Sequence, residues 1–347
     1  MHRSRCRPSV AAFVVCAFAM PAVAQFPRLV SPNGFGPVPG ANTTGYPFGY
    51  ANYQSFRYQQ IHDDVTGIAR VMLGLAIRRK EIGAPYVAFS PTLRIDLSTG
   101  GVTSQSATST YATNHGPNVA TVMATTTLNF AATNPPTDAL AAPFAYRMPF
   151  DQPFVYSGAG SICWEIVMTA STFTAGTTMN FDLVQNGIAR NQAYGNGCGG
   201  VTLTGSYAAP NLVQTVSGLA PNAPAVLMLG VENLRAFGLP LPLDLGVLGA
   251  VGCSLYLEPA AYVTVVGSAS GVATLSTNVS QMQPDFVLQF QALAPSAANP
   301  LGLSFSNALA AMPVTPRTFM RNWNSNVASA TGNLQLIFGL AVEFLQP

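Results

Sequence analysis

Charged side chains are scarce in this sequence: Asp, Glu, Lys and Arg make up 8% of the 347 residues, whereas about 25% is typical of soluble domains. Lys80 is the only lysine. The formal net charge of +2 is small, so the chain lacks the basic surface that binding to nucleic acid or anionic lipid requires. A hydrogen-bonding but nearly uncharged surface suits a protein that packs into a layer, a matrix or an assembly.

Residue types and motifs that commonly carry out catalysis are also rare. Histidine occurs three times, no Gly-x-Ser-x-Gly segment precedes a predicted helix, and no glycine-rich phosphate-binding loop is present. The hydrophobic fraction of 49% is ordinary, so the composition is not that of a membrane protein. We therefore expect no hydrolase triad, no cofactor and, as the leading hypothesis, no enzymatic activity.

The first 24 residues have the pattern of a secretory signal peptide. Arginines at positions 3, 5 and 7 precede an apolar stretch, Val10–Met20, and Ala22–Ala24 forms a small-x-small cleavage site. The apolar stretch is too short to span a bilayer. A lipoprotein is disfavoured because Cys16 lies inside the apolar run. Cleavage leaves 12 basic against 13 acidic residues, and we expect a secreted or cell-surface protein with no remaining membrane span.

Three cysteines remain after the predicted cleavage, namely Cys163, Cys198 and Cys253. Export permits a disulfide, and three cysteines allow three pairings with one thiol left over. We predict a Cys198–Cys253 bond, because both residues lie in glycine-rich turns of the same predicted domain. Cys163 lies in an apolar run, which favours a buried and unreactive thiol.

The pattern of the first half predicts short β-strands. Residues 25–45 are rich in Pro, Gly and Asn and are expected to form an irregular lead-in. In the following region apolar residues alternate, as with Leu93, Ile95 and Leu97, and no helical stripe of useful length appears. Strands are predicted at residues 69–78, 92–97, 120–130, 144–154, 162–170 and 179–185. This spacing predicts a jelly-roll-like β-sandwich over residues 46–195.

A second domain is predicted to begin at the glycine-rich segment Tyr194–Gly200, which is typical of a boundary. Beyond it strands are predicted at residues 201–207, 212–217, 225–231, 254–258, 261–266, 272–277, 287–293 and 303–309. This density of short strands is typical of an Ig-like sandwich, assigned here to residues 196–315. The predicted fold class is therefore all-β, with two tandem β-sandwich domains.

Residues 316–347 form a predicted C-terminal extension that ends in one long β-strand, Asn333–Leu345. Gln335 and Glu343 fall on one face of this strand. Six apolar residues share the other face: Leu334, Leu336, Phe338, Leu340, Val342 and Phe344. We expect the extension to complete a sheet of the first domain.

The second domain resembles a recurring C-terminal module of uncharacterised secreted proteins from planctomycete bacteria. The residues that carry this resemblance are Gly197-Cys198, Val216–Ala225, Leu239–Leu245, Gly252–Tyr256 and Asn299–Asn307. The region from Arg57–Ile61 to Ile77–Arg79 also resembles the front domain of such proteins. The resemblance implies export, an all-β fold and a Cys198–Cys253 bridge, and it supplies no catalytic residue.

The best candidate for a metal site is the tripeptide His62-Asp63-Asp64. Metal sites need three or four converging ligands, so a solvated turn is the favoured interpretation, and a calcium or transition-metal site is the alternative. His115 lies in a predicted loop and is expected to be structural.

The best candidate for a binding surface is the aromatic segment that contains Tyr46, Tyr50, Tyr53 and Tyr58. Tyrosines with few charges around them can form a platform for sugar rings or peptides. The same composition can also close one end of a sandwich, and we favour this packing interpretation.

Paired carboxylates could hydrolyse glycosides, and the first domain holds Asp96, Asp151, Glu165 and Asp182. Neighbouring residues on a strand point to opposite faces, so we expect Trp164 in the core and Glu165 outside.

The run Arg78–Glu81 follows a predicted strand and precedes Gly83 and Pro85, which predicts a solvated turn.

These observations favour a secreted, non-catalytic structural or adhesive protein of the cell envelope or extracellular space. Its expected partners are glycans or other envelope and matrix proteins. Two alternatives remain open: a carbohydrate-binding module that acts through the exposed tyrosines, and a secreted glycoside hydrolase that uses first-domain acids.

Overall fold

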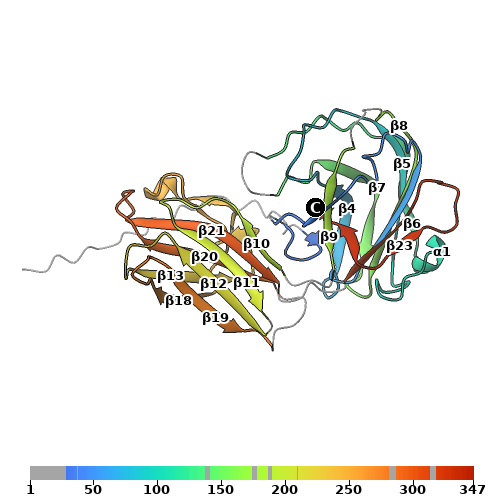
Figure 1. The fold of residues 1–347 in the computed structure, drawn as a ribbon. Coiled ribbons are helices and arrows are strands. Elements are labelled where there is room, and N and C mark those ends of the chain that lie inside the picture. Colours follow the sequence, from blue (N-terminus) through green and yellow to red (C-terminus); the bar gives the residue numbers. More distant parts are fainter. Residues whose placement is uncertain are drawn as a thin grey trace, which may run out of the picture.

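A computed structural model describes residues 29–36, 38–136, 141–173, 178–186, 190–208, 210–280, 287–312 and 318–347. The predicted signal peptide lies outside these residues. The described chain is 52% strand and 2% helix, and its strands pair antiparallel (Figure 1). The prediction of an all-β fold is confirmed. Among the described residues, no helix is long and apolar enough to cross a membrane.

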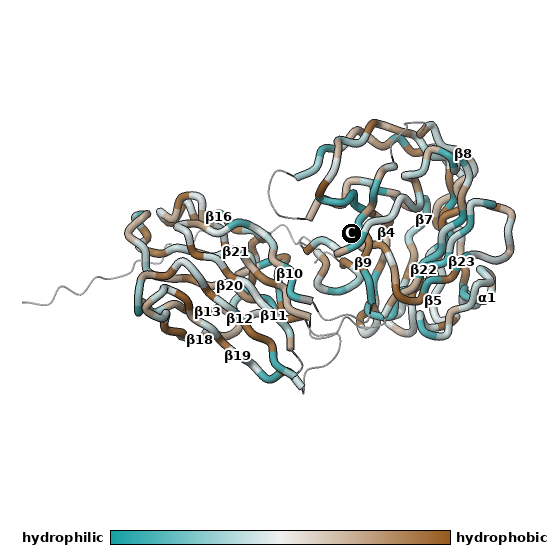
Figure 2. The backbone as a smooth tube through the Cα atoms, viewed as in Figure 1, coloured by the Kyte–Doolittle hydropathy of each residue, from teal (hydrophilic) through white to brown (hydrophobic). Residues whose placement is uncertain are grey.

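Alternation of side chains explains why the strands form where they do. In β5 (Pro91–Thr99) the side chains of Leu93, Ile95 and Leu97 are all fully buried, because every second residue of a strand faces the same side. Figure 2 shows apolar and polar residues following one another at short intervals along both halves of the chain. This short period is typical of sheets that bury one face.

Three sheets make up the first unit, which we define as the strands of residues 29–186 and 318–347. One has the order β1 (Leu29–Ser31), β25 (Val342–Leu345), β4 (Arg70–Ile77) and β7 (Tyr146–Tyr156). A second has the order β2 (Asn42–Thr44), β9 (Phe181–Gln185) and β24 (Phe338–Leu340). The third has the order β23 (Asn333–Gln335), β22 (Phe319–Asn324), β3 (Phe56–His62), β8 (Ile162–Ser171), β5 and β6 (Ala120–Thr127).

These three sheets share one apolar core. Met72 and Phe344 come from the first sheet, Phe181 from the second, and Trp164 and Ile166 from the third. The only α-helix in the described chain, α1 (Tyr111–Asn114), lies on the opposite side of the six-stranded sheet, within a segment that covers part of its outer face. The six strands predicted in this half correspond to β4 to β9. Strand β3 was not predicted, and the lead-in, predicted as irregular, contains the short strands β1 and β2.

The C-terminal extension belongs to the first unit, but it does not end in one long strand. Residues 333–345 contain β23, β24 and β25, and each of these strands joins a different sheet. The prediction of a single strand over Asn333–Leu345 was therefore wrong. Leu336 and Ile337 lie exposed between β23 and β24, where the chain leaves one sheet for the next. An alternating pattern cannot show such a transfer, because each short strand keeps the same period.

The second unit comprises residues 190–312. Its larger sheet has the order β10 (Arg190–Tyr194), β21 (Leu303–Met312), β20 (Leu288–Pro295), β13 (Pro224–Gly230) and β18 (Ala261–Val266). Its smaller sheet has the order β11 (Thr202–Ala208), β12 (Asn211–Ser217) and β19 (Ala273–Asn278). Apolar side chains of both sheets, such as Leu203, Leu212, Leu227 and Phe290, form one cluster between them. All eight strands predicted in this half are present.

A long excursion covers the outer face of the larger sheet. It contains the pairs β14 (Arg235–Ala236) with β15 (Leu239–Pro240) and β16 (Leu243–Asp244) with β17 (Ser254–Leu255), and the turn η1 (Gly246–Leu248). A disulfide joins Cys198 to Cys253 and so fixes the excursion to the turn before β11. This bond confirms the predicted pairing. Cys163 is a free, buried thiol, also as predicted.

The second unit is inserted into the first, between β9 and β22. Its first and last strands, β10 and β21, pair with each other, so the chain enters and leaves the unit at adjacent places, as insertion of one unit into another requires. The glycine-rich segment predicted as a domain boundary lies inside this unit, between β10 and β11. Lead-in residues such as Phe35 and Val38 join an apolar cluster with Tyr256 and Met312 of the second unit.

Candidate functional site

The tyrosine candidates divide into buried and surface residues. Tyr58 is fully buried, its ring lies 5.3 Å from that of Trp164, and its hydroxyl donates to Gln60 at 2.8 Å. Tyr46 is buried too, and its ring stacks on Trp323 at 4.2 Å. Burial raises the pKa of both phenols above the ordinary value. Both residues close the core, as the packing interpretation expects.

Tyr50 and Tyr53 are the two tyrosines of the group that reach the surface. Tyr53 is exposed and Tyr50 is half-buried. Their ring centres lie 5.5 Å apart with an angle of 78° between the planes, so one flat sugar ring cannot stack on both. The exposed part of the segment therefore offers a single aromatic face, on Tyr53.

His62 lies inside the first unit and takes part in a chain of hydrogen bonds. Its Nε2 receives hydrogen bonds from Trp164 Nε1 and Gln60 Nε2, both at 2.9 Å. Because Nε2 accepts both hydrogen bonds, the ring proton lies on Nδ1, and Nδ1 donates to Ser31 Oγ at 2.5 Å. Ser31 in turn donates to Asp64 Oδ1 at 2.5 Å. The series links β3 and β8 to the N-terminal strand β1.

Burial shifts both titratable groups of this series toward their neutral forms. It lowers the pKa of His62 to about 3, so the ring is neutral at neutral pH. It raises the pKa of Asp64 to about 6, although hydrogen bonds from Ser31 and from the Asn33 amide oppose this shift. A neutral imidazole could ligate a metal, but both ring nitrogens of His62 are already engaged in hydrogen bonds.

The predicted metal tripeptide does not converge on one point. Asp63 turns away from the His62 series and accepts hydrogen bonds from the amide and hydroxyl of Ser104. Within the described ranges, no three His, Cys, Asp or Glu side chains are placed to hold a metal ion. His62 and Asp64 instead meet through Ser31, which sequence reasoning did not connect to them.

A second polar series lies on the outer face of the six-stranded sheet, under the segment that contains α1. Ser98 Oγ lies 2.8 Å from His115 Nδ1, and His115 Nε2 lies 3.2 Å from Glu165 Oε2. Arg57 Nε donates to the other oxygen of Glu165, Oε1, at 2.6 Å, and Gln59 Nε2 donates to Oε2 at 3.0 Å. Serine, histidine and glutamate in this order have the composition of a hydrolase triad.

The accessibility of Ser98 argues against that chemistry. Ser98 is fully buried, and its oxygen accepts a hydrogen bond from the Gly116 amide at 3.1 Å. A catalytic serine must face the substrate. Burial would raise the pKa of Glu165, but hydrogen bonds from His115 and Arg57 and the charge of Arg57 outweigh it and lower that pKa. The series therefore holds a buried carboxylate in place and ties the loop of His115 to the sheet.

The predicted positions of Trp164 and Glu165 were partly right. Trp164 lies in the core and Glu165 lies on the opposite face of the sheet. Glu165 is nevertheless buried rather than solvent-exposed, because the segment after β5 folds over it. Its cross-strand neighbour Asp96 bonds to Arg94 and Thr121. These two acids are therefore part of the packed structure and do not line an open cleft.

The charge run after β4 is buried, so the prediction of a solvated turn was wrong. Arg78 and Arg79 are each 1% exposed and Lys80 is 4% exposed. Asp182 on β9 accepts from Arg78 at 2.8 Å and lies 3.5 Å from Lys80 Nζ. The Gly40 amide also donates to both Asp182 oxygens. The cations thus neutralise a buried acid.

Position 40 requires a glycine. A β-carbon there would lie 2.3 Å from the Leu183 carbonyl oxygen, which is far inside van der Waals contact. The close approach lets the lead-in reach Asp182, and the charge cluster therefore fixes the lead-in to β9.

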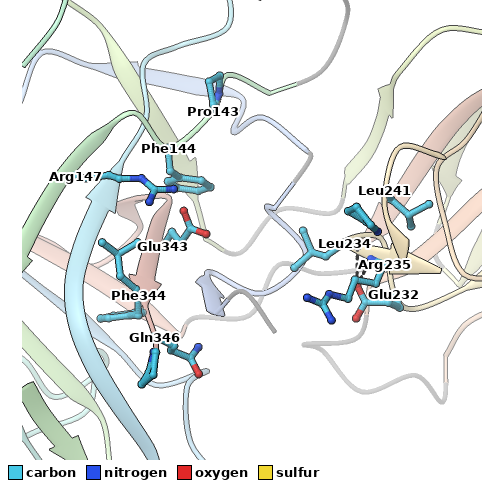
Figure 3. A pocket seen from close by; sticks show the side chains of 13 residues that line it. Pro143, Phe144, Arg147, Glu232, Leu234, Arg235, Leu241, Glu343, Phe344 and Gln346 are labelled. Atoms are coloured by element: carbon cyan, nitrogen blue, oxygen red, sulfur yellow. Dashed lines mark hydrogen bonds between the residues drawn. The ribbon is translucent and has the colours of Figure 1, made fainter. Parts of the chain in front are cut away.

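A cavity with a volume of about 630 Å³ lies between the two units. Figure 3 shows Phe144, Arg147 and Glu343 on one side and Leu234, Arg235 and Glu232 on the other. The Glu232 carboxylate accepts a hydrogen bond from the Leu234 amide at 2.6 Å and so stabilises the turn in which both residues lie. No Ser, Cys, His, Lys or Tyr is among the lining residues, so the reactive groups that the cavity offers are the two carboxylates, Glu232 and Glu343, beside arginine and apolar side chains.

Comparison of the chain with protein-family models gives no match, and comparison with curated proteins gives none either.

Proposed function

We propose that this chain is an exported, non-catalytic protein of the cell envelope or extracellular space, with a structural or adhesive role through surface packing or glycan contact. In this proposal the first unit is a jelly-roll-like sandwich and the second an Ig-like sandwich, of the kind found in secreted planctomycete proteins. The facing sheets of the second unit and the apolar cluster between them support that assignment.

The observation that carries the proposal is where reactive and apolar side chains lie. His62, Glu165 and Asp182 are buried and bonded to other protein groups. By contrast, apolar side chains are exposed in the turn around η1, where Val247 is 86% and Val251 is 77% exposed. Clustered exposed apolar groups are typical of contact surfaces. A surface that offers contacts and keeps its reactive groups inside suits a structural role.

The Cys198–Cys253 disulfide supports the exported location. Such bonds persist in oxidising compartments and are rare where thiols are kept reduced. Expression of the full chain in a bacterial host tests this part. We expect a processed product that begins at Gln25, identified by N-terminal sequencing of the exported fraction. Retention of the uncleaved chain inside the cell would contradict it.

Sedimentation with an insoluble bacterial cell-envelope fraction tests the role itself. We expect the processed protein to sediment with this fraction, and the triple variant Val247→Ser, Leu248→Ser, Val251→Ser to sediment less, because the exposed apolar turn is lost. The matched control is Val155→Ser, an exposed valine on β7 of the first unit, which should behave like the wild type. A wild-type protein that stays dispersed, or that releases reducing sugars from the envelope material, would overturn the proposal.

A further inference from the structure

Strand β18 forms one edge of the larger sheet in the second unit, and no described strand pairs with its outer side. The Gly267 amide donates to the Ala223 carbonyl at 2.9 Å, which marks a hydrogen-bonded position of the β13–β18 ladder. Such positions alternate along an antiparallel pair. Tyr262, Thr264 and Val266 therefore direct their amide and carbonyl groups away from β13, toward the open edge.

Three other sheet edges of this protein, β7, β6 and β11, carry devices that block pairing. Strand β7 contains Pro149 and Pro153, which lack an amide donor. On β6 the Ala124 amide donates to Asp151 at 2.7 Å. On β11 the side chain of Asn307 bonds to both the amide and the carbonyl of Leu203, each at 2.9 Å. Proline, charge and side-chain capping are the usual protections of an edge strand.

Strand β18 has none of these protections. Residues 260–280 contain no charged residue and no proline. On the outer face Tyr262 is 62% and Val266 is 64% exposed, while Val263 and Val265 face the core between the sheets. An uncharged edge with β-branched and aromatic residues is a template for another extended strand. Water satisfies these backbone groups in the free chain, and an extended strand is the partner that replaces all of those hydrogen bonds at once.

We propose that β18 pairs antiparallel with β18 of a second copy of this chain, with the twofold axis at Thr264. This inference rests on the proposed structural role and names the surface through which copies associate. The strand is self-complementary about Thr264: Tyr262 faces Val266 of the second copy, and Val263 faces Val265 of the second copy. Aromatic with β-branched pairs are favourable across strands, and no like charges meet.

In this register the five-stranded sheet continues into the sheet of the second copy. Thr264 exchanges two backbone hydrogen bonds with Thr264 of the second copy, and each Tyr262–Val266 pair exchanges two more. A symmetric contact of this kind closes on itself and forms a dimer. The apolar turn around η1 lies outside the pairing and stays available to other contacts.

Cysteine cross-linking tests the register. In Thr264→Cys the two Cα atoms would lie about 5.5 Å apart, within the range of about 4.4 to 6.8 Å that a disulfide spans. The native cysteines do not interfere, because Cys198 and Cys253 are bonded and Cys163 is buried. We expect the processed full chain with this substitution to form a covalent dimer under mild oxidation, seen on a non-reducing gel.

Two matched variants serve as controls. In Tyr262→Cys the two thiols would be about 14 Å apart, so this variant alone should form no covalent dimer, whereas its mixture with Val266→Cys should give the disulfide-linked heterodimer. Thr204→Cys introduces a thiol on β11, where Thr204 is also an exposed strand residue, and should not cross-link. Thr264→Lys should raise the dissociation constant at least tenfold in sedimentation equilibrium, with an unchanged circular dichroism spectrum.

The outcomes separate this inference from the proposed function. Equal cross-linking of Thr264→Cys and the two controls, or no cross-linking of any variant, overturns the β18 register. If the protein then still sediments with the envelope fraction, the structural role stands and another surface carries it. If it neither cross-links nor sediments, both the pairing and the proposed function fail.

Discussion

Replacing Asp182 by Asn tests the charge cluster that fixes the lead-in to the first unit. Asp182 accepts from Arg78 Nε at 2.8 Å, lies 2.7 Å from Arg78 Nη2 and 3.5 Å from Lys80 Nζ, and receives the Gly40 amide. An amide keeps one acceptor oxygen for Gly40 but removes the charge. Arg78 then becomes a buried cation without its acid, a change that costs about 3 to 5 kcal/mol.

Tryptophan fluorescence in urea measures this cost for the first unit alone. Both tryptophans, Trp164 on β8 and Trp323 on β22, belong to that unit, so the signal does not report on the second. At a slope of about 2 kcal/mol per M, we expect the urea midpoint to fall by about 2 M. The matched control, Asp151→Asn, changes an exposed acid of the first unit whose oxygen accepts a hydrogen bond from the Ala124 amide, and it should lower the midpoint by less than about 0.5 M. A loss below about 1 kcal/mol for Asp182→Asn would refute the reasoning, because it would mean that water reaches Arg78.

Three further predictions concern the disulfide, the buried histidine and the buried thiol. The double variant Cys198→Ala, Cys253→Ala opens a loop with a sequence separation of 55 and should destabilise the second unit by about 4 kcal/mol in the chain-entropy model; calorimetry should show one lowered transition, and two unchanged transitions would contradict it. The pKa of His62 is lowered to about 3, so its contribution to stability is present above about pH 6.5 and is lost as the pH falls, by about 2 kcal/mol between pH 7.5 and pH 5. The raised pKa of Asp64, about 6, acts in the opposite direction, because the folded protein takes up a proton on Asp64 over this range. The Asp64→Asn variant should therefore lose more stability than the wild type on acidification, as measured by urea midpoints. Equal losses in the two proteins would show that protonation of Asp64 does not stabilise the fold. Burial raises the pKa of Cys163, so a maleimide at pH 8 should label it only in denaturant, and rapid labelling of the native protein would show that the thiol is accessible.

Local patterns were enough to predict the fold class and most strands. The alternation of Leu93, Ile95 and Leu97 reflects burial of one sheet face, and that pattern is visible over a few residues. The Cys198–Cys253 bond followed from two glycine-rich turns in one predicted domain. Strand β3 was missed because buried glutamines, Gln59 and Gln60, interrupt its apolar pattern.

Contacts between distant segments account for the wrong predictions. Arg78 and Lys80 look solvated in the sequence because their acid, Asp182, lies about a hundred residues further on. The covering of Glu165 depends on His115, which reaches it from a loop.

The candidate sites show the same limit. Polar residues at alternate positions of β5, Asp96 and Ser98, signal an outward face, and Glu165 continues that face on β8. This pattern could have indicated that the three residues share a surface. It could not show that a loop from residues 100–118 covers them, because the loop is fixed by side-chain bonds such as Asn114 to Gln59 at 2.8 Å. The two residues of each such bond are far apart in the sequence, so the local pattern does not show that they meet.

Sedimentation equilibrium of the processed full chain, over a range of protein concentrations and at 50 and 500 mM salt, tests the central claim most directly. An uncharged contact surface should give self-association that rises with protein concentration and changes little with salt, since there is little charge to screen. A single monomeric species at every concentration, or association that disappears at high salt, would contradict the view that this protein acts through uncharged surface packing.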